Sequence, residues 1–196
     1  GFTSQAASEQ PEVTTITETK GENTNTHTAV QAISQNIVAS AQEMTDASQQ
    51  VIADNIAKKE EEERLAREKA EQEAKEKAER EAREAYVRAN QELLASIIYC
   101  EAGNQPYEGQ VAVGAVIMNR VKSGSYPNSI EEVIYQSGQF GPAATGWLNR
   151  VRSSKGYSQT ALQAAVDALN GSNPIGNCLY FDQGGAGMKI GAHYFH

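Results

Sequence analysis

The 196-residue sequence has few of the residues that metal centres, disulfide frameworks and membrane spans require. It has two cysteines, which allow one disulfide at most, and three histidines, of which only His193 and His196 follow residue 90. A catalytic zinc ion commonly needs three histidine or carboxylate ligands, so we expect no metal and no cofactor. No run of about 18 apolar residues is present, so we expect no membrane span in this chain.

Positive charge is also scarce where a nucleic-acid-binding surface would need it. Residues 1–90 hold 11 Lys and Arg against 18 Asp and Glu, whereas residues 91–196 hold 6 against 7. The net charge of −8 therefore lies almost wholly in the amino-terminal part. Because binding to phosphates demands a basic face, we expect no nucleic-acid partner for the nearly neutral carboxy-terminal part.

The amino-terminal part is predicted to form a tail, then an amphipathic helix, then a charged helical spacer. Residues 1–28 are too polar to offset the entropy of ordering, which predicts a disordered tail. Residues 29–57 predict an amphipathic helix with a heptad-like repeat, in which one position is held by Val30, Ile37, Met44 and Val51. This helix either packs on its own domain or self-associates through residues 30–56. Residues 58–89 are rich in i,i+4 pairs of opposite charge, which favours a solvated helical spacer.

Two apolar helices are predicted to enclose one carboxylate in the domain formed by residues 90–196. The run from Leu93 to Ile98 has helical spacing, and Gly103 is expected to end that helix by adopting a left-handed backbone. The segment after Pro106 is apolar almost all round, which is typical of a central helix. Glu101 would then lie at the rim of the core, where desolvation raises the pKa of a carboxyl toward that of a general acid. Its position also fits an exposed glutamate at a frayed helix end.

The remainder of this domain predicts short elements. Ser129 and Ser158 stand at helix-capping positions, residues 138–146 are rich in glycine and predict a loop, and residues 147–152 predict a short helix. Two short apolar runs, 178–181 and 190–195, flank a Gly-rich connection and predict a hairpin. The predicted fold class is therefore α+β, mostly helical, with a small β-hairpin.

One stretch of this domain contains a recognisable sequence motif. Residues 101–121, EAGNQPYEGQVAVGAVIMNRV, follow the pattern E-A-x-G-E-P-Y-x-G-Q-V-A-V-x-A-V-x-x-N-R-V, with further matches between residues 127 and 193. On these residues, the chain from about 91 to 196 resembles the SleB/CwlJ family of bacterial cell-wall hydrolases, which includes spore-cortex-lytic enzymes. Asn104 and Gln105 depart from the glycine and the second acid of the pattern.

The resemblance implies a lysozyme-like catalytic domain that acts on peptidoglycan glycan strands as a lytic transglycosylase. In that reaction the muramic C6 hydroxyl attacks its own anomeric carbon, so one residue can act first as acid and then as base. The resemblance assigns this double role to Glu101, and no second carboxylate is obviously placed opposite it. The candidate substrate-binding residues are Tyr107, Glu108, Gln139, Phe140, Trp147 and Tyr180. For Phe140 and Tyr180 a place in the core fits equally well.

Other interpretations of the sequence stay open. Cys100 and Cys178 either form a disulfide or remain buried free thiols. The protein is either the proposed enzyme, an N-acetylmuramoyl-L-alanine amidase, or a non-catalytic peptidoglycan-binding protein. A Cys100 nucleophile would need a histidine partner, for which the domain offers His193. We expect a secreted protein of the cell wall or spore, whose removed export signal would not be visible after Gly1.

Overall fold

The computed structural model describes Gly1 and residues 23–196, in two units, Gly1–Glu68 and Lys69–His196. In chain order the elements are α1 (Asn23–Ala102), α2 (Tyr107–Lys122), α3 (Ile130–Ile134), α4 (Gly141–Thr145), α5 (Trp147–Ser154), α6 (Gln159–Leu169), β1 (Phe181–Asp182), β2 (Met188–Ile190) and β3 (His193–Phe195). Most of the tail predicted for residues 1–28 falls on residues 2–22, which lie outside the described residues. Its last six residues, 23–28, belong to α1.

Residues 23–68 of the first unit form a helix without a core. All its described side chains are exposed, including the heptad residues Val30, Ile37 and Met44, each at least half accessible. Pairs along the helix support it instead, such as Arg64 with Glu68 at 2.6 Å. Self-association through residues 30–56 stays a prediction.

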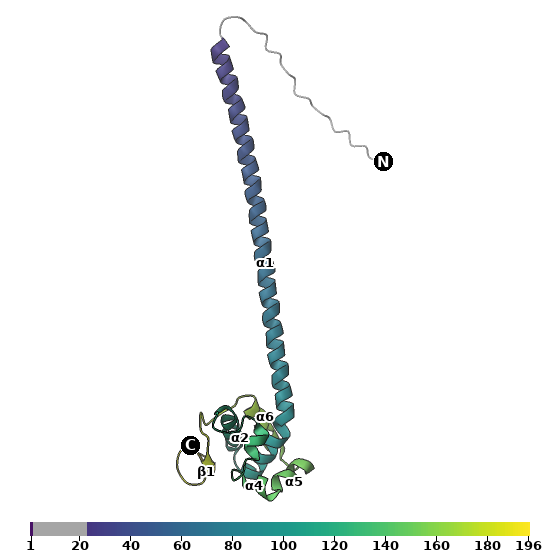
Figure 1. The fold of residues 1–196 in the computed structure, drawn as a ribbon, viewed down its shortest axis with the longest axis vertical. Helices are drawn as coiled ribbons and strands as arrows, with labels where there is room; N and C mark the ends of the chain where they lie inside the picture. The colour runs from purple at the N-terminus through teal and green to yellow at the C-terminus, as the bar shows by residue number, and fades with distance from the viewer. Residues whose placement is uncertain (2–22) are drawn as a thin grey trace. The chain divides into compact units, whose positions relative to one another are not determined.

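The second unit has its core around α2, as the apolar composition of that segment predicts. Side chains of α2 from Val111 to Met118 are buried, and the last turns of α1 add Leu94 and Ile98 to the same cluster. Figure 1 shows the short helices and the sheet gathered around the carboxy-terminal end of α1. Helices α2 and α6 approach closely at Gly114, where a Cβ would lie 2.8 Å from the Cβ of Ala168. Gly114 therefore fixes how closely these two helices pack.

The predicted helix caps are confirmed, whereas the left-handed backbone expected at Gly103 is not found. The Ser129 hydroxyl accepts from the Glu132 amide, and the Ser158 hydroxyl accepts from the Ala161 amide. Gly103 follows the end of α1 without a positive φ. It is needed for another reason, because a Cβ there would lie 2.5 Å from the Tyr99 carbonyl oxygen.

The segment 138–146, predicted as a loop, contains the helix α4. A proline in the first turn of a helix loses no hydrogen bond, so Pro142 does not prevent helix formation there. The predicted helix at residues 147–152 is confirmed as α5.

The predicted hairpin is present as part of a three-stranded antiparallel sheet with the order β1-β3-β2. Phe181 pairs with Phe195, and Ile190 pairs with His193. The run 190–195, predicted as one strand, is divided because Gly191 turns the chain with a φ of 60°. The mostly helical α+β class with a small sheet is confirmed. No described helix combines the length and the apolar character that a membrane crossing needs.

Candidate active site

Glu101 lies on the last turn of α1, on the face that enters the core. The residues three and four positions before it, Ile98 and Ile97, are fully buried, so the Glu101 side chain projects from the same apolar face. Its burial raises the pKa of the carboxyl above the ordinary value, with desolvation as the cause. In the described part of the chain, the carboxyl has no hydrogen-bond or ion-pair partner. A group in this position holds a proton at a higher pH than a solvated glutamate does.

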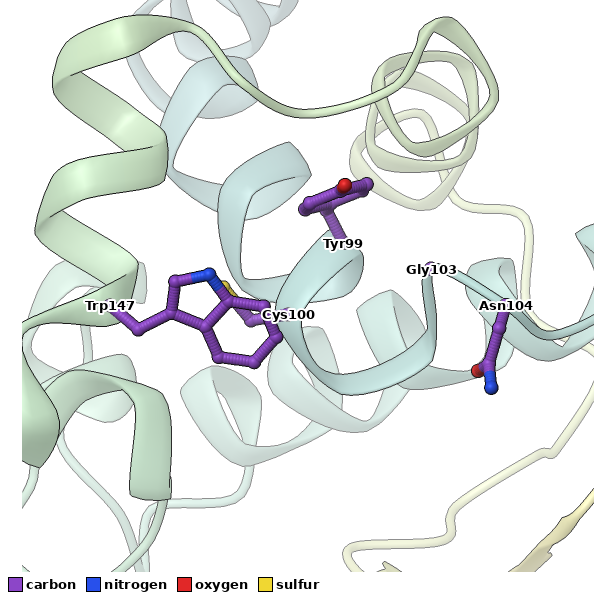
Figure 2. A pocket seen from close by; sticks show the side chains of 5 residues that line it. All are labelled: Tyr99, Cys100, Gly103, Asn104 and Trp147. Carbon is purple, nitrogen blue, oxygen red and sulfur yellow. The ribbon is translucent and has the colours of Figure 1, made fainter.

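A pocket with a volume of about 390 Å³ is lined by residues that precede and follow Glu101 in the sequence, although Glu101 is not among its lining residues. Its lining consists of Tyr99, Cys100, Gly103, Asn104 and Trp147. Figure 2 shows the indole of Trp147, from α5, at one side of this pocket next to Cys100, and Asn104 at the other side. The Trp147 side chain is 41% exposed, so its ring is available for stacking on a ligand.

Cys100 and Cys178 are both free and half-buried, so the disulfide that the sequence allows is not formed in this structure. The two cysteines have different surroundings: Cys100 lines the Trp147 pocket, and the carbonyl oxygen of Cys178 accepts from Asn119 at 2.9 Å. Burial, followed by the charge of Glu101, raises the pKa of Cys100 to about 11. A thiol with this pKa is a poor nucleophile, which disfavours a role for Cys100 in covalent catalysis.

Arg120, which the sequence reasoning did not single out, organises three of the predicted substrate-binding residues. Its guanidinium donates to the Gln139 side-chain oxygen at 3.2 Å, and its central carbon lies 5.4 Å from the Phe140 ring and 5.6 Å from the Tyr180 ring. Tyr180 is 47% exposed and Gln139 is exposed, so both can meet a ligand. Phe140 is only 4% exposed and packs near Phe181, which favours the place in the core that the sequence also allows over contact with a ligand.

The structure ties Tyr107 to α6. The Tyr107 hydroxyl donates to Asp167, whose other carboxylate oxygen accepts from Gln163 at 3.0 Å. This contact joins residues 60 positions apart in the sequence and orients the exposed Tyr107 ring. Glu108 is exposed in the first turn of α2, where the helix dipole favours a carboxylate in any protein. Nothing in its contacts distinguishes it as a ligand-binding group.

Gln105, which replaces the second acid of the family pattern, has a structural role here. Its side-chain oxygen accepts from the Ala192 amide at 2.8 Å, and its carbonyl oxygen accepts from Gln110 at 3.0 Å. The segment after Glu101 is thereby attached both to the turn between β2 and β3 and to α2. The side-chain amide oxygen accepts the bond from Ala192 where a carboxylate oxygen could, so the replacement leaves this attachment intact.

The other acidic side chains of the domain are engaged elsewhere or exposed. Glu92 lies 3.5 Å from the Lys155 amine, and Asp182 lies 2.9 Å from the His196 ring, which lowers the pKa of Asp182. Glu131 and Glu132 occupy the first turn of α3. Among the acidic residues of positions 91–196, Glu101 alone combines burial with a raised carboxyl pKa.

A metal centre has little support from the described side chains. No three of the histidine, cysteine and acidic residues at positions 23–196 are grouped so that they could bind an ion. His193 is buried between the rings of Phe181 and Phe195, with a buried ring nitrogen that has no hydrogen-bond partner, and burial lowers its pKa. Its surroundings are those of a neutral core histidine.

Comparison with known proteins identifies relatives of the second unit. Residues 104–195 match the family model described as cell wall hydrolase, a match that begins three residues after Glu101. A spore cortex-lytic enzyme from Bacillus cereus is 41% identical over 96 residues, which is 49% of this chain and 35% of that protein. The corresponding enzyme from Bacillus subtilis is 42% identical over 89 residues, 45% of this chain and 28% of that protein. The chain thus spans about a third of the length of the curated relatives it matches.

One solved structure is also similar to this chain in sequence. The catalytic domain of the germination-specific lytic transglycosylase SleB from Bacillus anthracis is 36% identical, and the match covers 54% of this chain and 92% of that domain, with a TM-score of 0.48. The resemblance that the motifs of residues 101–193 indicate is confirmed by these matches. Residues 104–195 of this chain thus form a cell wall hydrolase domain.

Proposed function

We propose that this protein cleaves peptidoglycan glycan strands as a lytic transglycosylase, with Glu101 as its single acid and base. The observation that supports this most strongly is the state of Glu101: its carboxyl is half-buried, has no partner among the described residues, and has a raised pKa. The remaining carboxylates of the domain are engaged elsewhere or exposed, and a reaction that needs one carboxylate suits such a site. The names of the relatives, spore cortex-lytic enzymes, agree with this chemistry.

The proposed reaction conserves the proton on Glu101. The protonated carboxyl gives its proton to the oxygen between muramic C1 and the C4 of the next sugar, and the C1–oxygen bond breaks. The muramic C6 oxygen forms a new bond to C1, and the Glu101 carboxylate takes the proton of that hydroxyl. The products are a 1,6-anhydro-muramic end and a free C4 hydroxyl, with no water consumed. Desolvation of Glu101 favours the first step because it keeps the carboxyl protonated at a higher pH.

The exposed side chains around the domain suggest how the glycan is held. We assign ring stacking to Trp147, Tyr180 and the Tyr107 ring that Asp167 orients, and we assign hydrogen bonding to Gln139. The substrate would lie outside the cell, in the vegetative wall or the spore cortex, so the protein would act after export.

Product analysis tests this proposal. Purified vegetative peptidoglycan and spore cortex are digested with the full chain, and the released muropeptides are identified by mass spectrometry. Muropeptides with anhydro-muramic ends are expected from at least one substrate. Reducing ends would instead show hydrolysis, free stem peptides would show an amidase, and retention on the wall without any product would show a binding protein.

A further inference from the structure

Arg120 is a buried cation that lacks an anionic partner. The residue is 5% exposed on α2, and no Asp or Glu at the described positions forms an ion pair with it. Three aromatic rings surround the guanidinium instead, those of Tyr126 at 4.9 Å, Phe140 at 5.4 Å and Tyr180 at 5.6 Å. Desolvation lowers the pKa of the group. Ring faces stabilise a cation less than a hydrogen-bonded carboxylate does, so the buried positive charge of Arg120 is only partly compensated.

The hydrogen bonds of Arg120 determine which way Gln139 presents its amide. The Arg120 Nε donates to the Leu179 carbonyl oxygen at 2.8 Å, and a terminal nitrogen donates to the Gln139 Oε1 at 3.2 Å. A guanidinium has donors only, so the Gln139 oxygen must face it. The Gln139 amide nitrogen therefore points away from Arg120, and no acceptor for it is present in the described part of the chain.

The backbone holds Gln139 at this place independently. The Gln139 amide donates to the Gln136 carbonyl oxygen at 3.2 Å, in a turn that depends on the left-handed backbone of Gly138. The side chain is exposed and lies beside the exposed Tyr180 ring through their shared contact with Arg120. A fixed donor beside an aromatic face suits a ligand that offers an amide carbonyl next to an apolar sugar face.

We propose that Arg120 positions Gln139 as a hydrogen-bond donor to an amide carbonyl of the substrate, and that Gln139 thereby selects N-acetylated glycan. The proposal rests on the proposed peptidoglycan-cleaving function. A glutamate at position 139 would compensate the buried charge of Arg120 and stabilise the fold, but it would present no donor. With glutamine at position 139 the fold is less stable than with glutamate, but the side chain can donate to the substrate, a trade-off that is common in binding sites.

The Gln139→Glu variant tests separately the positioning of residue 139 by Arg120 and the donor role of Gln139. The control is Gln183→Glu, which adds the same charge to an exposed loop. The single tryptophan, Trp147, reports unfolding of the domain by its fluorescence. We expect Gln139→Glu to raise the unfolding temperature by about 4 °C or more, because a kcal/mol corresponds to about 4–8 °C in a domain of this size. The control is expected to raise it by less than about 1 °C.

Recognition is measured with three forms of peptidoglycan: intact, chemically N-deacetylated, and freed of stem peptides. We expect Gln139→Glu to cleave the intact and the stem-free forms about tenfold more slowly than the wild type. On N-deacetylated glycan, whose cationic amines a carboxylate attracts, the variant should be no slower than the wild type. A loss confined to stem-bearing glycan would place the carbonyl in the stem peptide and would overturn the selection of N-acetylated glycan.

Each negative result of these two experiments has a distinct interpretation. An unchanged unfolding temperature would overturn the positioning by Arg120, and a raised temperature with wild-type cleavage would overturn the donor role. If the wild type cleaves none of the three forms, the proposed enzymatic function fails, and the comparison passes to co-sedimentation with intact and N-deacetylated peptidoglycan. Weaker retention of Gln139→Glu on the intact form alone would support the donor role, whereas equal retention, or none by either protein, would overturn it.

Discussion

The close approach of α2 and α6 at Gly114 makes a quantitative prediction about the domain that supports the site. In the Gly114→Ala variant, the added Cβ would lie 2.8 Å from the Ala168 Cβ and 3.2 Å from the Ile98 Cδ1. Ordinary carbon contacts are about 3.5–4.0 Å, so the two helices would have to separate by roughly 1 Å. Ile98 can change its rotamer, but the Ala168 Cβ is fixed to the backbone and cannot move away alone.

The expected magnitude follows from two opposing effects. Overpacking costs about 1–3 kcal/mol, and replacing a helical glycine by alanine returns about 1 kcal/mol. We therefore expect Gly114→Ala to lower the free energy of unfolding by about 1 kcal/mol, or the unfolding temperature by about 4–8 °C. Ala168→Gly should cost about 1 kcal/mol through helix propensity alone. The double variant restores the space, so it should be nearly as stable as the wild type.

Urea denaturation of the four proteins, followed by Trp147 fluorescence, measures the coupling directly. A double variant that is about 1–2 kcal/mol more stable than the sum of the single effects would confirm the contact. Simple additivity would refute it. The contact matters for the site because the same pair of helices brings Tyr107 to Asp167.

Two further predictions concern the consecutive residues Cys100 and Glu101. Burial raises the pKa of Glu101 in the folded protein, so its contribution to stability is present at low pH and is lost as the pH rises through the folded pKa. Glu101→Gln should therefore unfold at a higher temperature than the wild type at pH 8, with the difference fading below about pH 4. A difference that does not vary with pH would contradict the burial of this carboxyl. Cys100, with a pKa of about 11, should be alkylated by iodoacetamide at pH 8 on the order of tenfold or more slower than a solvated cysteine. The measurement uses Cys178→Ser to remove the second thiol, and a rapid reaction would show that Cys100 is not desolvated.

Local signals in the sequence were enough for much of the fold. The caps at Ser129 and Ser158 act on amides three residues away, so a short stretch of sequence contains the whole interaction. The buried helix α2 follows from its composition, since an all-apolar helix has no stable place on a surface. Glu101 was predicted correctly at the edge of this core because it follows Ile97 and Ile98 by one turn.

The parts that sequence reasoning missed depend on distant partners. Arg120 meets Gln139 19 residues later and Leu179 59 residues later, and no local pattern contains these pairs. The available signal was the charge itself, since a basic residue in an otherwise buried helix requires compensation. The division of the run 190–195 depends on Gly191, where the chain passes so close to Gln105 that a Cβ would lie 2.5 Å from its side-chain oxygen.

The central claim is that one carboxylate performs the chemistry, and paired amide variants test it most directly. Initial rates of anhydro-muropeptide release are measured for the wild type, Glu101→Gln and Glu108→Gln, with unfolding temperatures to show that each protein is folded. Since general acid–base catalysis contributes about 10²–10⁴-fold, we predict a loss of at least about 100-fold for Glu101→Gln. Glu108→Gln should stay within about threefold of the wild type. A comparable loss in Glu108→Gln would show that two carboxylates are needed, and retained activity in Glu101→Gln would contradict the account altogether.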